Sequence, residues 1–329
     1  MNNKAKIIKI AETSIKIIIV VLGIWILYKK IIQNQNVTQV WNEIKTSFTN
    51  SRQFLLMIAA FILVSLNILL EAFKWKVQVK PIEDISIWKS FISIFTGMTA
   101  GMFFPNRMGN FLGRIFMLER GDRIKAAMVT IVGGMGQMIA TVSFGLLALL
   151  IFVEKYKTLL FIGVIIIITI LIVLYFNIHL LKYLQILIPK RFKEKTKSYV
   201  EIFSQYTKKE LLNILIISFA RYLLYSFQFV LLIWAFNVPL SYFNAMIPIS
   251  MTYLMMMVVP FITITEIAVR GSISIIIFEK WLIMNGINTS LSAMVFSASS
   301  LLWIFNIAIP SVIGLFLTNR LKFFRKNEL

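Results

Sequence analysis

The chain has no cysteine and a single histidine among its 329 residues. Disulfides and thiolate metal sites are therefore excluded. Charged residues make up only 15% of the chain, whereas about a quarter of a soluble domain is charged. Acidic residues are especially scarce, with 14 Asp and Glu against 34 Lys and Arg. No cluster of metal ligands, nucleophile with a base or phosphate-binding loop is visible, so we expect no metal, no cofactor and no enzymatic activity.

The chain is instead rich in long apolar segments. Apolar residues make up 59% of it, and the mean hydropathy is +0.83. A helix that crosses a bilayer requires about 18 or more apolar residues. We predict an all-α polytopic membrane protein with six full spans, at about residues 12–32, 53–72, 126–152, 159–178, 210–236 and 292–318.

Two further apolar regions are interrupted. Region 88–119 contains FFPNRMGNFLGR, and region 243–286 contains VVPFITITEIAVRGS. Proline breaks a helix, and glycine permits close approach of the backbone. The expected structural breaks are Pro105, Gly109, Pro260 and Gly271. The first region is predicted to be a re-entrant hairpin, and the second is either another hairpin or two short spans broken near Pro260.

Lysine and arginine concentrate on one set of links, which precede residue 12, follow residue 318, or lie within 72–126 and 178–210. Positive residues accumulate on cytoplasmic links, so both termini are expected in the cytoplasm, in a bacterial plasma (inner) membrane. The net charge of +20 favours membrane lipids with anionic headgroups as partners. No nucleic-acid partner is expected, because aromatic and basic residues are not interleaved on any long polar segment.

The predicted order of elements repeats with opposite direction. Two spans, a hairpin from the cytoplasmic side and a span are followed by two spans, a region entered from outside and a span. We predict a single transmembrane domain, 1–329, with an inverted repeat whose halves are 1–152 and 153–329. Broken segments at matching places in the halves indicate a transporter binding site near the bilayer midplane.

A charged side chain near the bilayer centre costs about 2.5 to 3.5 kcal/mol on insertion scales, so each one needs a partner or water. The candidates in the interrupted regions are Arg107, Arg114, Glu266 and Arg270. Glu71 and Arg221 are weaker candidates, since Glu71 is placed at the cytoplasmic end of a span and Arg221 has possible partners inside the bundle.

The first interrupted region predicts an anion site. A new helix is expected to begin near Asn110, and the free N–H groups of its first turn, together with Arg107 and Arg114, suit a lipid phosphate. In the alternative interpretation, these arginines extend to the cytoplasmic headgroups. For Arg114 the sequence favours neither interpretation over the other.

The second interrupted region places Glu266 and Arg270 four residues apart, on one face of a helix. A buried structural ion pair is one interpretation. A polar cavity is the other, which we favour because Thr263, Thr265 and Gly271 surround the pair, and a lipid-facing helix has no use for such a cluster.

FFPNRMGNFLGRIFMLERGDRIKAAMVTIVGG and VVPFITITEIAVRGS resemble the two signatures of the lysylphosphatidylglycerol synthase transmembrane family. The number and order of spans extend the resemblance over nearly the whole chain. The matching positions are Pro105, Arg107, Gly109 and Arg114 in the first signature and Pro260, Glu266 and Gly271 in the second. The resemblance implies the flippase-like membrane half of multiple peptide resistance factor, which moves aminoacylated phosphatidylglycerol between leaflets, or a stand-alone relative.

The chain departs from the family pattern at two places. Asn110 stands where the family usually has glutamate, and Thr263 to Thr265 replace the usual pair of glycines. A cationic headgroup would lose a counter-ion at Asn110, so the resemblance does not carry specificity for aminoacylated lipid. The chain ends at Leu329, with no room for an aminoacyl-transferase domain, and is not expected to make the lipid itself.

The leading hypothesis is a flippase-like protein that moves an anionic or zwitterionic lipid, or a lipid-linked headgroup, between leaflets. Substrate-binding residues are then Arg107, Asn110, Arg114, Glu266 and Arg270. Two alternatives are a membrane-embedded enzyme with Glu266 as acid or base, and a scaffold for a lipid- or glycan-modifying enzyme partner.

Overall fold

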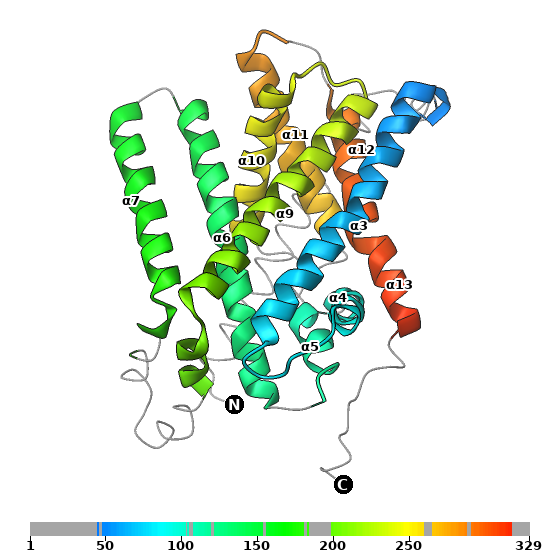
Figure 1. Cartoon of the computed structure of the whole chain (residues 1–329). Coiled ribbons are helices and arrows are strands. Elements are labelled where there is room, and N and C mark those ends of the chain that lie inside the picture. The colour runs from blue at the N-terminus through cyan, green and yellow to red at the C-terminus, as the bar shows by residue number, and fades with distance from the viewer. Residues whose placement is uncertain are drawn as a thin grey trace, which may run out of the picture.

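The computed structural model describes residues 45, 48–102, 104, 108–119, 122–153, 156–180, 183, 199–259, 265–287 and 291–317. Within these residues the regular structure is helical, and no β-strand occurs (Figure 1). The protein is therefore an all-α polytopic bundle, as its composition predicts.

Five helical segments are long and apolar enough to cross a membrane. They are α3 (Ser51–Val79), α6 (Arg123–Phe152), α7 (Lys157–Phe176), α9 (Lys208–Ala235) and the continuous segment formed by α12 (Ser292–Trp303), the π-helix η6 (Ile304–Ala308) and α13 (Ile309–Leu317). These segments coincide with five predicted spans. The predicted span at 12–32 lies outside the described residues.

Polar caps fix where three of these helices begin. Asn50 Oδ1 accepts a 3.0 Å hydrogen bond from Arg52 N at the start of α3. Asp122 Oδ1 accepts one of 2.7 Å from Ile124 N at the start of α6. Thr207 and Glu210 form a capping box at the start of α9. Such caps satisfy N–H groups that the first helical turn leaves without partners.

The first interrupted region forms two short helices, α4 (Ile87–Gly101) and α5 (Gly109–Ile115), which pack against each other. Their contact depends on glycine. A Cβ atom added at Gly113 would lie 2.4 Å from the carbonyl oxygen of Thr96, and one at Gly109 would lie 2.2 Å from that of Ala100. Glycines spaced four residues apart allow membrane helices to approach this closely.

The second interrupted region forms α10 (Tyr242–Val258) and α11 (Glu266–Met284). In Figure 1, α10 descends from the top of the bundle to its middle and α11 returns to the top. Of the two alternatives, this is the hairpin. Pro260 lies outside the described residues. Gly271 does not break a helix, contrary to our expectation, but lies within α11, where a Cβ atom would be 2.4 Å from the ring of Phe296 on α12.

The two hairpins pack in matching ways. α4 lies against α13, and α10 lies against α6, so each hairpin contacts the last span of the opposite predicted half. α3 and α9, which hold equivalent places in the predicted repeat, pack along each other. These contacts relate equivalent elements of the two predicted halves, and the inverted repeat itself stays a prediction.

Two apolar cores divide the bundle. One includes Phe229 and Phe278, and the other includes Trp75 and Ile94. On α6 the boundary between them falls at residues 139 and 140, and on α9 it falls between residues 215 and 222. Polar side chains gather near this boundary, in the middle of the bundle.

Candidate functional site

A cavity of about 470 Å³ lies where the two predicted halves meet. Its walls come from α3, α4, α5, α6, α9, α10, α11 and η6, so both hairpins contribute. Its volume is in the range of small-molecule sites, about 300 to 1,000 Å³. Its polar lining residues include Asn67, Asn110, Gln137, Tyr225 and Asn306.

Glu71 is the centre of an ionic cluster on one side of this cavity. Its Oε1 accepts from Arg114 Nη1 of α5 at 2.7 Å. Its Oε2 binds Lys74 Nζ at 2.7 Å and also contacts Arg221 Nη1 of α9. Glu71 is 5% exposed and Lys74 is 3% exposed. One buried carboxylate thus joins three helices through three cations.

Amide side chains extend this cluster. Arg221 Nε donates to Asn67 Oδ1 at 3.0 Å, and Arg221 Nη1 donates to Gln137 Oε1 at 3.3 Å. Asn67 Nδ2 in turn donates to Asn306 Oδ1 at 3.2 Å. The amides fix the guanidinium of Arg221 between α3, α6 and η6.

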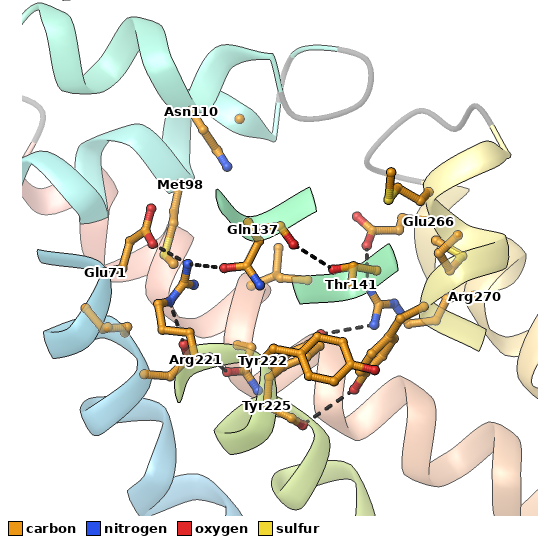
Figure 2. Close-up of a pocket in the computed structure, with 18 of the residues that line it drawn as sticks. Glu71, Met98, Asn110, Gln137, Thr141, Arg221, Tyr222, Tyr225, Glu266 and Arg270 are labelled. Carbon is orange, nitrogen blue, oxygen red and sulfur yellow. Dashed lines mark hydrogen bonds and ion pairs between the residues drawn. The ribbon is translucent and has the colours of Figure 1, made fainter. Parts of the chain in front are cut away.

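A second ion pair lies on the opposite side of the cavity. Arg270 Nη2 binds Glu266 Oε1 at 2.9 Å, and both residues are buried. Arg270 Nη1 donates to the hydroxyl of Tyr225 at 3.0 Å. Figure 2 shows Arg221 on one side of the cavity and Arg270 on the other, with Tyr222 and Tyr225 between them.

The charged groups of the site have an excess of positive charge. The cations are Lys74, Arg114, Arg221 and Arg270, and the anions are Glu71 and Glu266, so the four positive and two negative charges leave +2. Within the described residues, the buried Nε groups of Arg114 and Arg270 have no hydrogen-bond partner. Unpaired donors and excess positive charge in a low-dielectric site favour an anionic ligand.

The structure gathers four of the candidate residues from the sequence around this cavity: Asn110, Arg114, Glu266 and Arg270. One alternative was that Arg114 extends to the headgroups. In the structure its side chain instead binds Glu71 inside the bundle. Gly109 is the first residue of α5, next to Asn110 of the cavity lining. Arg107 and Pro105 lie outside the described residues.

Sequence reasoning placed Glu71 at the end of a span and gave Arg221 possible partners inside the bundle. Arg221 does pair there, with Glu71, but Glu71 is buried beside the cavity. A glutamate near the end of a span is easily assigned to the interface. Only the packing of α9 on α3 and the contact of Arg114 from α5 show that Glu71 is enclosed. Sequence reasoning missed the roles of Asn67, Gln137 and Asn306, although an amide inside an apolar segment was a usable signal. No group of three or more metal-ligating side chains occurs in the part of the chain that the structure describes.

Comparison with protein families gives a match over residues 14–277 to the model described as Lysylphosphatidylglycerol synthase TM region. The matched range includes the whole first hairpin, the second hairpin as far as residue 277 and every charged residue of the cavity described above. Neither the curated proteins nor the solved structures gave a match.

Proposed function

Because this chain belongs to the lysylphosphatidylglycerol synthase TM region family, we propose that it moves an anionic or zwitterionic lipid, or a lipid-linked headgroup, between the leaflets of a membrane. One observation carries this proposal. The cavity at the centre of the bundle is lined by both hairpins and has an excess of arginine over carboxylate. Broken helices that meet at the midplane are typical of transporter binding sites.

The phosphate of the headgroup is proposed to bind the arginines. Guanidinium groups bind phosphate oxygens in pairs, which fixes the orientation of the ligand. Met98, Met102, Met256 and Met257 also line the cavity. Flexible methionine side chains adapt to irregular apolar shapes, so they suit the glycerol backbone and the first carbons of the acyl chains.

We propose transport without chemical change of the lipid. General acid–base catalysis needs a group that exchanges a proton near the working pH. The two carboxylates of the cavity, Glu71 and Glu266, are instead each engaged in ion pairs with arginine, which is the arrangement of a binding site rather than of an acid–base pair. A separate lipid-modifying enzyme is the proposed source of any modified headgroup.

Reconstitution of the purified protein into liposomes tests the proposal. Labelled phosphatidylglycerol and phosphatidylethanolamine are placed in one leaflet, and their appearance in the other is measured with a membrane-impermeant quencher. We expect wild type to move at least one of them and to return it chemically unchanged. An altered product would point to an enzyme, and no movement of any anionic or zwitterionic lipid would refute the proposal.

A pair of variants locates the route. Arg270→Gln removes a cavity charge and is expected to abolish movement. Arg52→Gln removes an exposed charge at the start of α3 and is expected to leave movement unchanged. Both variants are first checked for a single peak in size-exclusion chromatography. Equal movement by Arg270→Gln and wild type would show that the lipid does not pass through this cavity.

A further inference from the structure

A second cavity, of about 280 Å³, adjoins the first. The residues that line both cavities are Glu71, Asn110, Arg114, Gln137 and Arg221. The Glu71 cluster is therefore the wall between the two cavities. The second cavity is also lined by Lys74 and by Gln78, whose buried Nε2 has no hydrogen-bond partner within the described residues.

The carboxylate of Glu71 makes the contacts that a phosphate group would make in this wall. Its two oxygens face two different arginines, Arg114 from α5 and Arg221 from α9. A phosphate binds arginine through the same type of charge-assisted hydrogen bond and has more acceptor oxygens than a carboxylate. An anion that entered either cavity would therefore find Arg114 and Arg221 already bound to Glu71.

We propose that Glu71 is an internal competitor of the ligand, so that the phosphate must displace this carboxylate from Arg114 and Arg221 before it binds in the wall. The inference rests on the proposed function, because it takes the cavity to bind a phosphate-bearing headgroup. In this proposal, Glu71 sets the affinity of the site for its ligand. A carboxylate that weakens binding allows the ligand to leave again, as transport requires.

The charges of the cluster make such an exchange feasible. Lys74, Arg114 and Arg221 carry three positive charges against one on Glu71, which leaves +2 for an incoming anion. Lys74 is one turn from Glu71 on the same helix, and their contact of 2.7 Å can persist when the arginines change partner. Glu71 thus keeps a counter-ion, and the unpaired Nε of Arg114 is an additional donor for the phosphate.

Binding of inorganic phosphate to the purified full chain in a non-ionic detergent tests this inference, with titration calorimetry as the measurement. Glu71→Gln keeps the shape of the side chain and removes its charge. We expect this variant to bind phosphate on the order of tenfold more tightly than wild type, since close buried charge pairs couple by at least that factor. Equal or weaker binding by Glu71→Gln would overturn the inference.

The matched control is Glu83→Gln. Glu83 binds Lys89 at 2.7 Å and lines neither cavity, so its removal is expected to leave phosphate affinity unchanged. Arg114→Gln provides the opposite change and is expected to weaken phosphate binding at least tenfold. A gain of affinity in Glu83→Gln equal to that in Glu71→Gln would show a general charge effect and would refute the role of Glu71.

Loss of Glu71 removes the shared counter-ion of the buried Lys74 and the partly buried Arg114 and Arg221, which is strongly destabilising. If Glu71→Gln does not fold, Glu71→Asp replaces it in the titration. The shorter aspartate side chain keeps the charge but cannot reach both arginines. This variant is also expected to bind phosphate more tightly. In addition, phosphate should raise the unfolding temperature of either variant more than that of wild type, and an equal rise in all three would contradict the inference.

Two ligands distinguish free phosphate from a lipid headgroup. Tighter binding of short-chain phosphatidic acid than of inorganic phosphate would identify a headgroup, and equal binding would identify phosphate itself. The inference and the proposed function fail separately. The titrations with Glu71 variants judge the competitor role, whereas lipid movement in liposomes by wild type judges transport.

Discussion

Asn67 on α3 donates a 3.2 Å hydrogen bond to Asn306 on η6, a residue 239 positions later in the chain. The bond joins the two predicted halves at the cavity. Asn67 also accepts from Arg221, so an amide pair between apolar spans orients a cavity arginine. Asn306 lies in a π-helix, and such widened turns are frequent at functional sites.

Replacement of Asn306 by leucine is predicted to destabilise the protein by about 1 to 3 kcal/mol, because the buried Nδ2 group of Asn67 loses its acceptor. Lipid movement should also fall, since Arg221 is less firmly oriented. The unfolding free energy is measured by denaturant titration of the purified protein. Asn177→Leu is the control, since Asn177 donates to the carbonyl of Val173 at the end of α7 and lines neither cavity. An equal loss of transport in both variants would contradict the prediction.

The pair formed by Glu266 and Arg270 is predicted to be strongly non-additive. Glu266→Gln or Arg270→Gln alone removes one charge of a buried ion pair and is expected to cost about 3 to 5 kcal/mol. The double variant should cost less than the sum, because it removes both charges. Unfolding free energies of the three variants give the coupling, and additive values would show that the pair does not act as a unit.

The sequence was sufficient for the overall architecture but not for the centre of the site. Long apolar runs determine spans through bilayer thickness alone, so five spans were placed correctly. The ion pair of Glu266 and Arg270 follows from helical spacing. Glu71 and Arg221, in contrast, are 150 residues apart, and no local pattern predicts that α3 and α9 bring them together.

Glycine was interpreted correctly in one hairpin and wrongly in the other. Gly109 follows a proline-containing stretch and begins α5, so the break was expected. Gly271 resembles it in sequence but lies within α11 because the helix needs a small residue against Phe296. Sequence alone does not distinguish a glycine needed for packing from one that ends a helix, since both avoid a Cβ atom.

The first hairpin is predicted to depend on Gly113. An alanine Cβ there would lie 2.4 Å from the carbonyl oxygen of Thr96 and 2.7 Å from Cα of Gly97. Backbone atoms of α4 cannot move without opening the hairpin, so Gly113→Ala should cost about 1 to 3 kcal/mol. Gly134→Ala is the control, because a Cβ on Gly134 of α6 meets nothing within 4 Å. It should be neutral or slightly stabilising. A thermal unfolding series tests this, and equal unfolding temperatures for both variants would contradict it.

The orientation in the membrane is predicted from the positive links, with both termini in the cytoplasm. The chain contains no cysteine, so a single introduced cysteine reports its own position. Ser241 precedes α10 and Ser204 lies in η4 (Glu201–Gln205), and both are exposed.

With this orientation, an impermeant maleimide should label Ser241→Cys in intact cells and should label Ser204→Cys only after the membrane is opened. The two positions lie on opposite sides of α9 (Lys208–Ala235), which crosses the bilayer between them, so they cannot share a side. The reverse pattern would place both termini outside. The hairpin of α4 and α5 would then open outward, and the lipid would meet Arg114 from the outer leaflet.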